Sequence, residues 1–244
     1  MNFIKNGQRH THRGIIGIET AVVLIAFVLV AATLSYVVLN TGFATSQKVK
    51  TSVGSTLSSA SDSLEVEGKV IASSYSPVGG ARSLNVTSIP IKIAGGGESV
   101  NLAGTITAVK YLSDSITYDN IYNGTLNARP TPTYNSLEAA TNAAATYDTS
   151  TGGKVISLSP FNGGDAGADD WPVETTAFIY WTSQANTNDI LEAGEHANLA
   201  IAFASGDRPE YLDKIRIELI QASGASLVVE RTVPIIQNEV VDLG

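Results

Sequence analysis

One feature constrains the fold of this chain more than any other: the apolar run from Ile15 to Leu39, IIGIETAVVLIAFVLVAATLSYVVL. Its one charged residue is Glu19. At about 1.5 Å per residue, a helix of this length extends roughly 37 Å, enough to cross a bilayer core of about 30 Å. Apolar residues occur on every side of such a helix, so one small domain cannot cover it. Lipid or other copies of the helix must therefore enclose it.

A short basic leader, residues 1–14, precedes this run. It contains Lys5, Arg9 and Arg13, has no acidic residue, and ends in Gly14. A secretory signal peptide has an apolar region of about 7–15 residues followed by a small-residue cleavage site. Here the apolar run is longer, and the small residue precedes it. Two interpretations remain open, namely an uncleaved signal anchor with its basic end in the cytoplasm and a leader that is removed ahead of the helix.

The leader and the start of the helix resemble the class III leader of type IV pilin-like proteins, because the basic segment ends in Gly14 and Glu19 is the fifth residue after it. In that family a membrane peptidase cuts after the glycine and leaves the helix on the mature chain. The resemblance implies cleavage between Gly14 and Ile15. The new amino group, with a pKa of about 7.7–8.0, would offset the roughly 2–3 kcal/mol that a carboxylate costs in lipid. Glu19 would then lie in the first turn, where the helix dipole favours an acid.

Composition predicts one ordered domain attached to this helix. Hydrophobic residues make up 43% of the chain and charged residues 16%. The absence of cysteine excludes a disulfide framework and thiolate metal sites. Without the leader the chain has twelve basic and twenty-three acidic side chains, a net charge of −11. Such a chain is a poor binder of nucleic acid, so we expect no nucleic-acid partner.

After Leu39 a narrower apolar stripe predicts that the helix continues to about Ser61. Beyond it, apolar residues recur at every second position, as in a β-strand. The domains expected are the leader 1–14, the helix 15–62 and a head 63–244. Seven or eight short strands predict an antiparallel, immunoglobulin-like β-sandwich, so the fold class is α+β. Besides residues following Ser61, the candidate strands are 84–94, 100–112, 154–159, 173–181, 197–204, 214–221 and 226–236. Residues 118–151 are expected to form a long surface excursion, with a helical turn at 136–144.

Three segments make the chain resemble archaellin, the archaeal flagellin. They are GIETAVVLIAFVLVAATLSYVVLN with FATSQK after it, SLNVTSIPIKIAGGGESVNL, and NDILEAGEHANLAIAF, which contains a recurrent Leu-Glu-x-Gly-Glu turn. Glu19 departs from the family, because many members have an uncharged residue there, which weakens any pairing role for it. The resemblance implies a structural, non-enzymatic subunit of the extracellular motility filament, without a cofactor. The partners implied are other copies or paralogous subunits, a prepilin-peptidase-like enzyme, an assembly ATPase and a membrane platform, with the membrane holding the precursor.

Physical chemistry supports assembly through the helix. Burying some twenty apolar side chains stabilises a buried state by about 30–60 kcal/mol gross, so a water-exposed monomer is untenable. Lipid is equally apolar, so association there depends on close packing of small residues. Such residues are Gly17, Ala21, Ala26, Ala31, Ala32 and Ser35. Head-to-tail contacts of this kind remain open and produce a filament. The alternatives are an adhesive pilin and a membrane-anchored surface-binding protein.

Few other residues suggest chemistry. N-glycosylation sequons begin at Asn85 and Asn123, and archaellins are commonly glycosylated, with Asn123 the better candidate because it lies in the loop-rich segment. Acidic side chains that could bind calcium are better explained as a solvated loop; they are Asp165, Asp169 and Asp170. His196 is expected at a surface turn. The aromatic residues Trp171, Tyr180 and Trp181 are candidates for either a sugar platform or strand packing.

Overall fold

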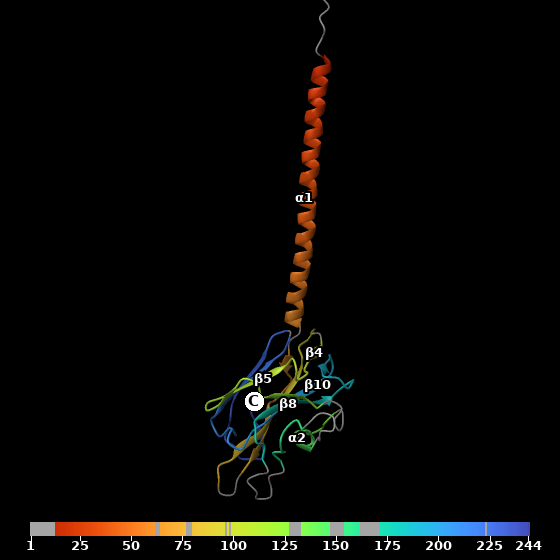
Figure 1. Ribbon diagram of the computed structural model, residues 1–244. Coiled ribbons are helices and arrows are strands. Elements are labelled where there is room, and N and C mark those ends of the chain that lie inside the picture. The colour runs from red at the N-terminus through yellow and green to blue at the C-terminus, as the bar shows by residue number, and fades with distance from the viewer. Residues whose placement is uncertain are drawn as a thin grey trace, which may run out of the picture. The chain divides into compact units, whose positions relative to one another are not determined.

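The computed structural model (Figure 1) describes most of the chain and divides into two units, with the boundary between residues 55 and 56. The residues described are 13–61, 64–76, 80–95, 97, 99–126, 133–146, 154–161, 171–222 and 224–244. Helix α1, Arg13–Ser61, is 49 residues long. It ends where the sequence predicts. The possible calcium ligands Asp165, Asp169 and Asp170 lie outside the described residues.

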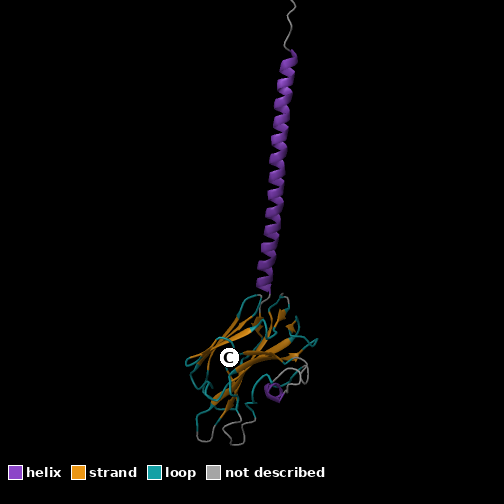
Figure 2. Cartoon of the chain, viewed as in Figure 1, coloured by secondary structure: helices purple, strands orange, loops and turns teal. Residues whose placement is uncertain are grey.

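Among its described residues, the head has two main sheets and a short third one, whose strands are orange in Figure 2. The larger sheet has the order β13-β2-β3-β10-β8-β7, with β1 also paired to β3. Its strands are β1 (Leu64–Val66), β2 (Ile71–Tyr75), β3 (Ser83–Ile93), β7 (Tyr122–Thr125), β8 (Thr176–Ser183), β10 (His196–Ala202) and β13 (Val240–Asp242). The four-stranded sheet has the order β12-β11-β5-β6. Its strands are β5 (Ala108–Ser113), β6 (Thr117–Tyr118), β11 (Lys214–Ile220) and β12 (Leu227–Thr232), and the short pair is β4 (Val100–Asn101) with β9 (Ile190–Leu191).

The main core lies between these two sheets. It forms because apolar residues occupy every second position of the strands and face the opposite sheet. In β11, Ile215, Ile217 and Leu219 are buried while the residues between them face outward, as expected for a strand with one covered face. They pack in the same cluster as Ile89 of β3 and Trp181 of β8. This arrangement confirms an α+β fold with mostly antiparallel sheets. One departure is β7, which pairs with β8 in parallel.

The larger sheet is also covered on its other face, by helix α2 (Leu137–Thr146). Its alanines, among them Ala140 and Ala144, are buried in a second cluster with Phe178 and Tyr180 of β8. Ser136 caps this helix, because its hydroxyl accepts a hydrogen bond from the Ala139 amide at 3.1 Å. The central strands are therefore apolar on both faces.

Two expectations about this region are wrong. Residues 118–151 are not simply a surface excursion, because they contain β7 and the packed helix α2. Residues 154–159 do not form a strand. Instead, the amides of Val155 and Ile156 donate to the carbonyl of Ala144 at 3.0 and 3.2 Å and satisfy the end of α2. Their side chains are buried in the second cluster.

The Leu191–Glu195 turn is held by a buried carboxylate. Glu195 is 3% exposed, and its two oxygens accept hydrogen bonds from the amides of Ala185 at 2.7 Å and Glu192 at 2.9 Å. Gly194 has φ +92°, a conformation that favours glycine. The sequence pattern Leu-Glu-x-Gly-Glu therefore has a physical basis, since the glycine makes the turn and the second glutamate closes it. The turn leads into β10.

The three candidate aromatic residues separate into two environments. Tyr180 and Trp181 belong to the cores, as strand packing predicts. Trp171 lies elsewhere, with its ring 4.5 Å from that of Tyr75 and the Arg208 guanidinium 4.0 Å from its centre. Burial lowers the pKa of Arg208 below its ordinary value. His196 is the first residue of β10 and contacts Glu67.

Candidate assembly interface

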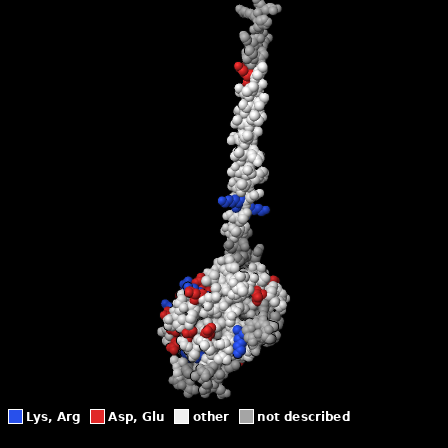
Figure 3. All heavy atoms as spheres, in the orientation of Figure 1, with Lys and Arg blue, Asp and Glu red and all other residues white. Residues whose placement is uncertain are grey.

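Helix α1 exposes its apolar side chains on all sides. Every described side chain from Gly17 to Thr56 is exposed, including Phe27 at 74%. This segment has a mean hydropathy of 2.8 over its most apolar window, and among the described residues it is the one helix long and apolar enough to cross a membrane. Figure 3 shows that its surface is almost free of charge. From Gly17 to Thr56 the charged residues are Glu19, Lys48 and Lys50.

The small residues of α1 concentrate on one face. Because each helical residue advances by about 100°, most of them fall within an arc of roughly 100°. The members of this small-residue face are Gly17, Ala21, Ala31, Ala32 and Ser35, and Gly42, which the sequence argument omitted, extends it. Ala26 lies on the opposite side. A Cβ added to Gly17 or Gly42 would meet nothing within 4 Å, so both positions are open to a neighbouring helix.

Large side chains share this face with the small ones. At the same angular step, Leu24, Val28 and Leu39 fall within the same arc. All three are exposed. Alternating large and small side chains form ridges and grooves into which another helix can pack. The face therefore has the shape that close helix–helix contact requires.

Three threonine hydroxyl groups in the apolar part of α1 are satisfied within the helix. Thr20, Thr33 and Thr41 donate to the carbonyls of Gly17, Val30 and Val37 at 3.1, 2.9 and 2.6 Å. A buried hydroxyl without a partner is costly in an apolar environment. These side chains can therefore enter lipid or a helical bundle without losing a hydrogen bond.

The proposed cleavage site lies at the beginning of α1. The helix starts at Arg13, so Gly14 and Ile15 are both helical. Glu19 is exposed and is the seventh residue of α1, with no acidic residue in the first turn. The expectation that Glu19 lies in the first turn concerns the cleaved chain, so the uncleaved helix does not test it. It applies to a helix that begins at Ile15.

The two sequon asparagines have different environments. Asn85 lies in β3 and is 4% exposed, so the folded head does not offer it to an enzyme. Asn123 lies in β7 and is exposed. Its side-chain nitrogen donates to the Val155 carbonyl at 2.6 Å. Asn123 thus stays a candidate for glycosylation of the folded chain, whereas Asn85 would need modification before folding.

The sequence matches known proteins over most of its length. The family described as archaeal-type flagellin matches residues 14–231. "Probable flagellin 1" of Aeropyrum pernix is 32% identical over 222 residues, which cover 91% of this chain and 92% of that protein. "Probable flagellin 1" of Archaeoglobus fulgidus is 36% identical over 111 residues, 45% of this chain and 50% of that one.

Solved structures share the fold. One is the archaeal flagellum of Methanospirillum hungatei, with a TM-score of 0.52 and 24% identity, covering 93% of this chain and 98% of that one. Another is archaeal flagellin FlaB1 of Methanocaldococcus jannaschii, with a TM-score of 0.51 and 12% identity, covering 74% of this chain and 95% of that one. Together with the exposed apolar helix and the Leu-Glu-x-Gly-Glu turn, the match over residues 14–231 leads to one conclusion: the chain belongs to the archaeal-type flagellin family.

Proposed function

We propose that this chain is a structural subunit of the archaeal motility filament and polymerises through α1. One observation carries the proposal: every described side chain from Gly17 to Thr56 is exposed, although the segment is strongly apolar. Water cannot be the final environment of such a surface. The head has two cores of its own among the described residues, and neither includes a residue of α1. We expect no enzymatic activity.

Before assembly, the cytoplasmic membrane holds the precursor through α1. The helix is longer than a bilayer core of about 30 Å requires. The basic residues Lys5, Arg9 and Arg13 fit an amino terminus on the cytoplasmic side. A prepilin-peptidase-like enzyme then cuts between Gly14 and Ile15. Cleavage gives the helix a new amino group close to Glu19.

Transfer from lipid to filament exchanges one apolar environment for another. The hydrophobic effect therefore contributes little to this step, and close packing along the small-residue face contributes more. An assembly ATPase and a membrane platform supply the work of extraction. In the filament the helices form the core, and the heads cover the outside and carry a glycan on Asn123. Contacts between non-equivalent faces stay open, which yields a helical polymer of this chain alone or with paralogous subunits.

The experiment replaces the chromosomal gene with a version encoding Gly14→Val. The unaltered chain should be recovered in sheared filaments with Ile15 as its first residue, as peptide mass mapping would show. The Gly14→Val chain should stay in the membrane fraction with the leader attached, and the cells should not swim. An Ala26→Val chain, altered on the same helix but away from both the cleavage site and the small-residue face, is the control for processing. An intact leader on chains taken from filaments would contradict the proposal.

A further inference from the structure

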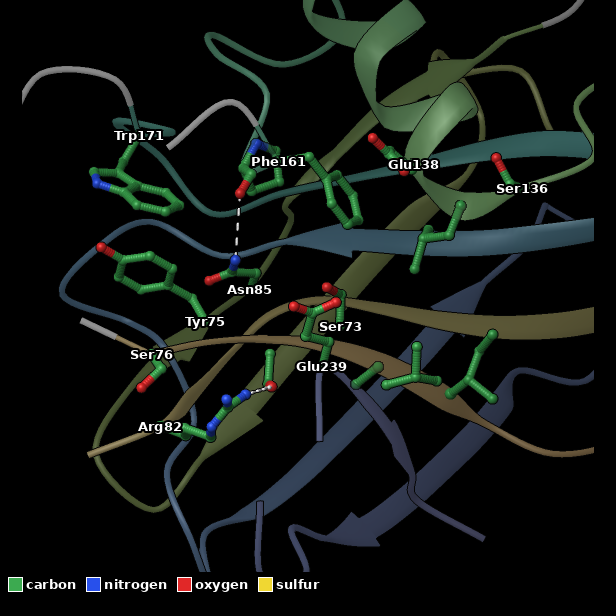
Figure 4. A pocket seen from close by; sticks show the side chains of 16 residues that line it. Ser73, Tyr75, Ser76, Arg82, Asn85, Ser136, Glu138, Phe161, Trp171 and Glu239 are labelled. Carbon is green, nitrogen blue, oxygen red and sulfur yellow. Dashed lines mark hydrogen bonds between the residues drawn. The ribbon is translucent and has the colours of Figure 1, made fainter. Parts of the chain in front are cut away.

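One pocket is lined entirely by residues of the head. It has a volume of about 800 Å³ and lies between β2, the start of α2 and the residue before β13 (Figure 4). Pockets of about 300–1,000 Å³ that combine apolar walls with a few convergent polar groups are the usual size and type of small-molecule sites. Here the aromatic side chains are Tyr75, Phe161 and Trp171, and the polar ones include Arg82, Asn85, Glu138 and Glu239.

Asn85 supplies an unsatisfied acceptor in this pocket. Its side-chain nitrogen donates to the Pro160 carbonyl at 3.3 Å. Its oxygen Oδ1 is buried and has no hydrogen-bond partner among the described residues. Figure 4 shows this oxygen on the side of Tyr75, whereas the dashed hydrogen bond leaves from the nitrogen. Most buried polar atoms in folded proteins have a partner, and one without a partner requires an explanation. A donor brought by a ligand is such an explanation.

The charges of the pocket restrict the kind of ligand. Glu138 and Glu239 are two carboxylates, and they are balanced by two guanidinium groups, that of Arg82 in the pocket lining and that of Arg208 against the Trp171 ring. Arg82 already donates to the Ser74 hydroxyl at 3.4 Å. The charges around the pocket therefore sum to about zero, which gives no net attraction for phosphate, sulfate or carboxylate groups. The site suits a neutral ligand that donates hydrogen bonds to Asn85 and the glutamates and accepts them from arginine.

The aromatic rings add a second requirement. Tyr75 and Trp171 lie 4.5 Å apart with an interplanar angle of 59°, and the Arg208 guanidinium, 4.0 Å from the Trp171 ring centre, fixes them further. Aromatic faces carry partial negative charge and pack against groups with polarised C–H bonds. A sugar ring offers hydroxyl groups at its edge and C–H groups on its faces. We propose that this pocket binds a neutral saccharide, with Asn85, Glu138 and Glu239 accepting hydrogen bonds from its hydroxyls and the aromatic residues packing against its ring.

The test uses assembled filaments of the full chain and equilibrium dialysis. The probes are radiolabelled methyl glycosides of glucose, galactose, mannose and N-acetylglucosamine, together with their neutral disaccharides. At least one should bind saturably, with one site per subunit and a dissociation constant on the order of 1 mM. Binding should also change tryptophan fluorescence, because Trp171 lines the pocket whereas Trp181 is fully buried.

Two variants assign the binding to the pocket. Glu239→Gln removes a charged acceptor from an exposed position, so folding is preserved while affinity falls about tenfold. Phe161→Ala removes an aromatic wall and should lower the affinity similarly. Glu174→Gln is the matched control, because Glu174 is exposed but does not line this pocket. Electron microscopy of each variant checks that filaments still form.

Each possible result either supports or overturns the proposal. It is overturned if none of the glycosides binds saturably at concentrations up to about 100 mM, or if Glu239→Gln and Phe161→Ala bind as well as the control. Saturable binding of choline or lysine with no binding of glycosides would also overturn it, in favour of a cation site. If glycosides bind, filaments stripped of their own glycans distinguish the sources: higher occupancy after stripping indicates a glycan of another copy, and unchanged occupancy indicates an external saccharide.

Discussion

Helix α1 and strand β8 are both dominated by apolar residues, yet their surroundings are opposite. Phe27 in α1 is 74% exposed, whereas Trp181 in β8 is 0% exposed. The strand finds its partners within the chain, on both faces of one sheet. The helix finds none among the described residues. Apolar sequence therefore shows that a segment must be covered, but its pattern decides whether the cover comes from the same chain or from another molecule.

The strongest test of this comparison is to introduce a charged side chain in the middle of α1. Val28→Asp places a carboxylate on the small-residue face, at a position that is exposed in the isolated chain. In lipid or a helical core this costs about 2.5–3.5 kcal/mol per subunit, so filaments should fall at least about 100-fold. The measurement is the amount of the chain in sheared filaments, with head folding followed by circular dichroism.

Val240→Asp is the matched control for that experiment. Val240 is similarly exposed but lies in the head, in β13, where water can solvate the new charge. Filament yield should stay near that of the unaltered chain. Normal yield from Val28→Asp would refute the assignment of α1 to the filament core.

A second prediction concerns the head alone. Gly194 adopts φ +92° in the turn before β10, and a side chain there is strained. Gly194→Ala should lower the free energy of unfolding by about 1–2 kcal/mol. Gly206→Ala is the control, because Gly206 has no positive φ and a Cβ added there would meet nothing within 4 Å. Thermal denaturation compares the two, and equal melting temperatures would contradict the role given to Gly194.

A third prediction compares the two sides of α1. Ala32→Leu places a large side chain on the small-residue face, whereas Ala26→Leu makes the same substitution on the opposite side of the helix. Overpacking at a helix contact costs about 1–3 kcal/mol. Filaments of the first variant should therefore dissociate at a lower temperature than those of the second. The reverse order would place the tightest contacts on the other side of the helix.

The smallest effect is expected for a solvent-exposed ion pair at the edge of the larger sheet. Lys69 pairs with Asp242, and this contact lowers the pKa of Asp242 from its ordinary 3.8. A depressed carboxyl pKa stabilises the fold above about pH 3.8, and the stabilisation is lost as pH falls through the folded value. The pKa of Asp242, measured by NMR titration, should rise toward 3.8 in the Lys69→Met variant. An unchanged pKa of Asp242 in this variant would show that Lys69 does not cause the lowered value.

Much of this architecture is predictable because its signals are local. The end of α1 at Ser61 and strands such as β11 follow from the period of apolar residues. The covering of the larger sheet by α2 is not predictable in this way, since α2 is rich in alanine and threonine and its burial depends on distant partners such as Phe178. Val155 shows the same limit, because an apolar run looks like a strand even where its amides end a helix. The pocket depends on segments far apart in sequence, so only the fold brings Asn85 and Trp171 together.

The pairing of β13 with β2 sets an order of events during synthesis. Val240–Asp242 complete one edge of the larger sheet by pairing with Ile71–Ser73. The ribosome makes α1 first and these residues much later, by roughly 10–40 s at the usual rate of about 5–20 residues per second. The helix can thus enter the membrane while the head is still incomplete. With α1 inserted as proposed, a chaperone or protease that acts on the unfinished head would act on a membrane-anchored chain.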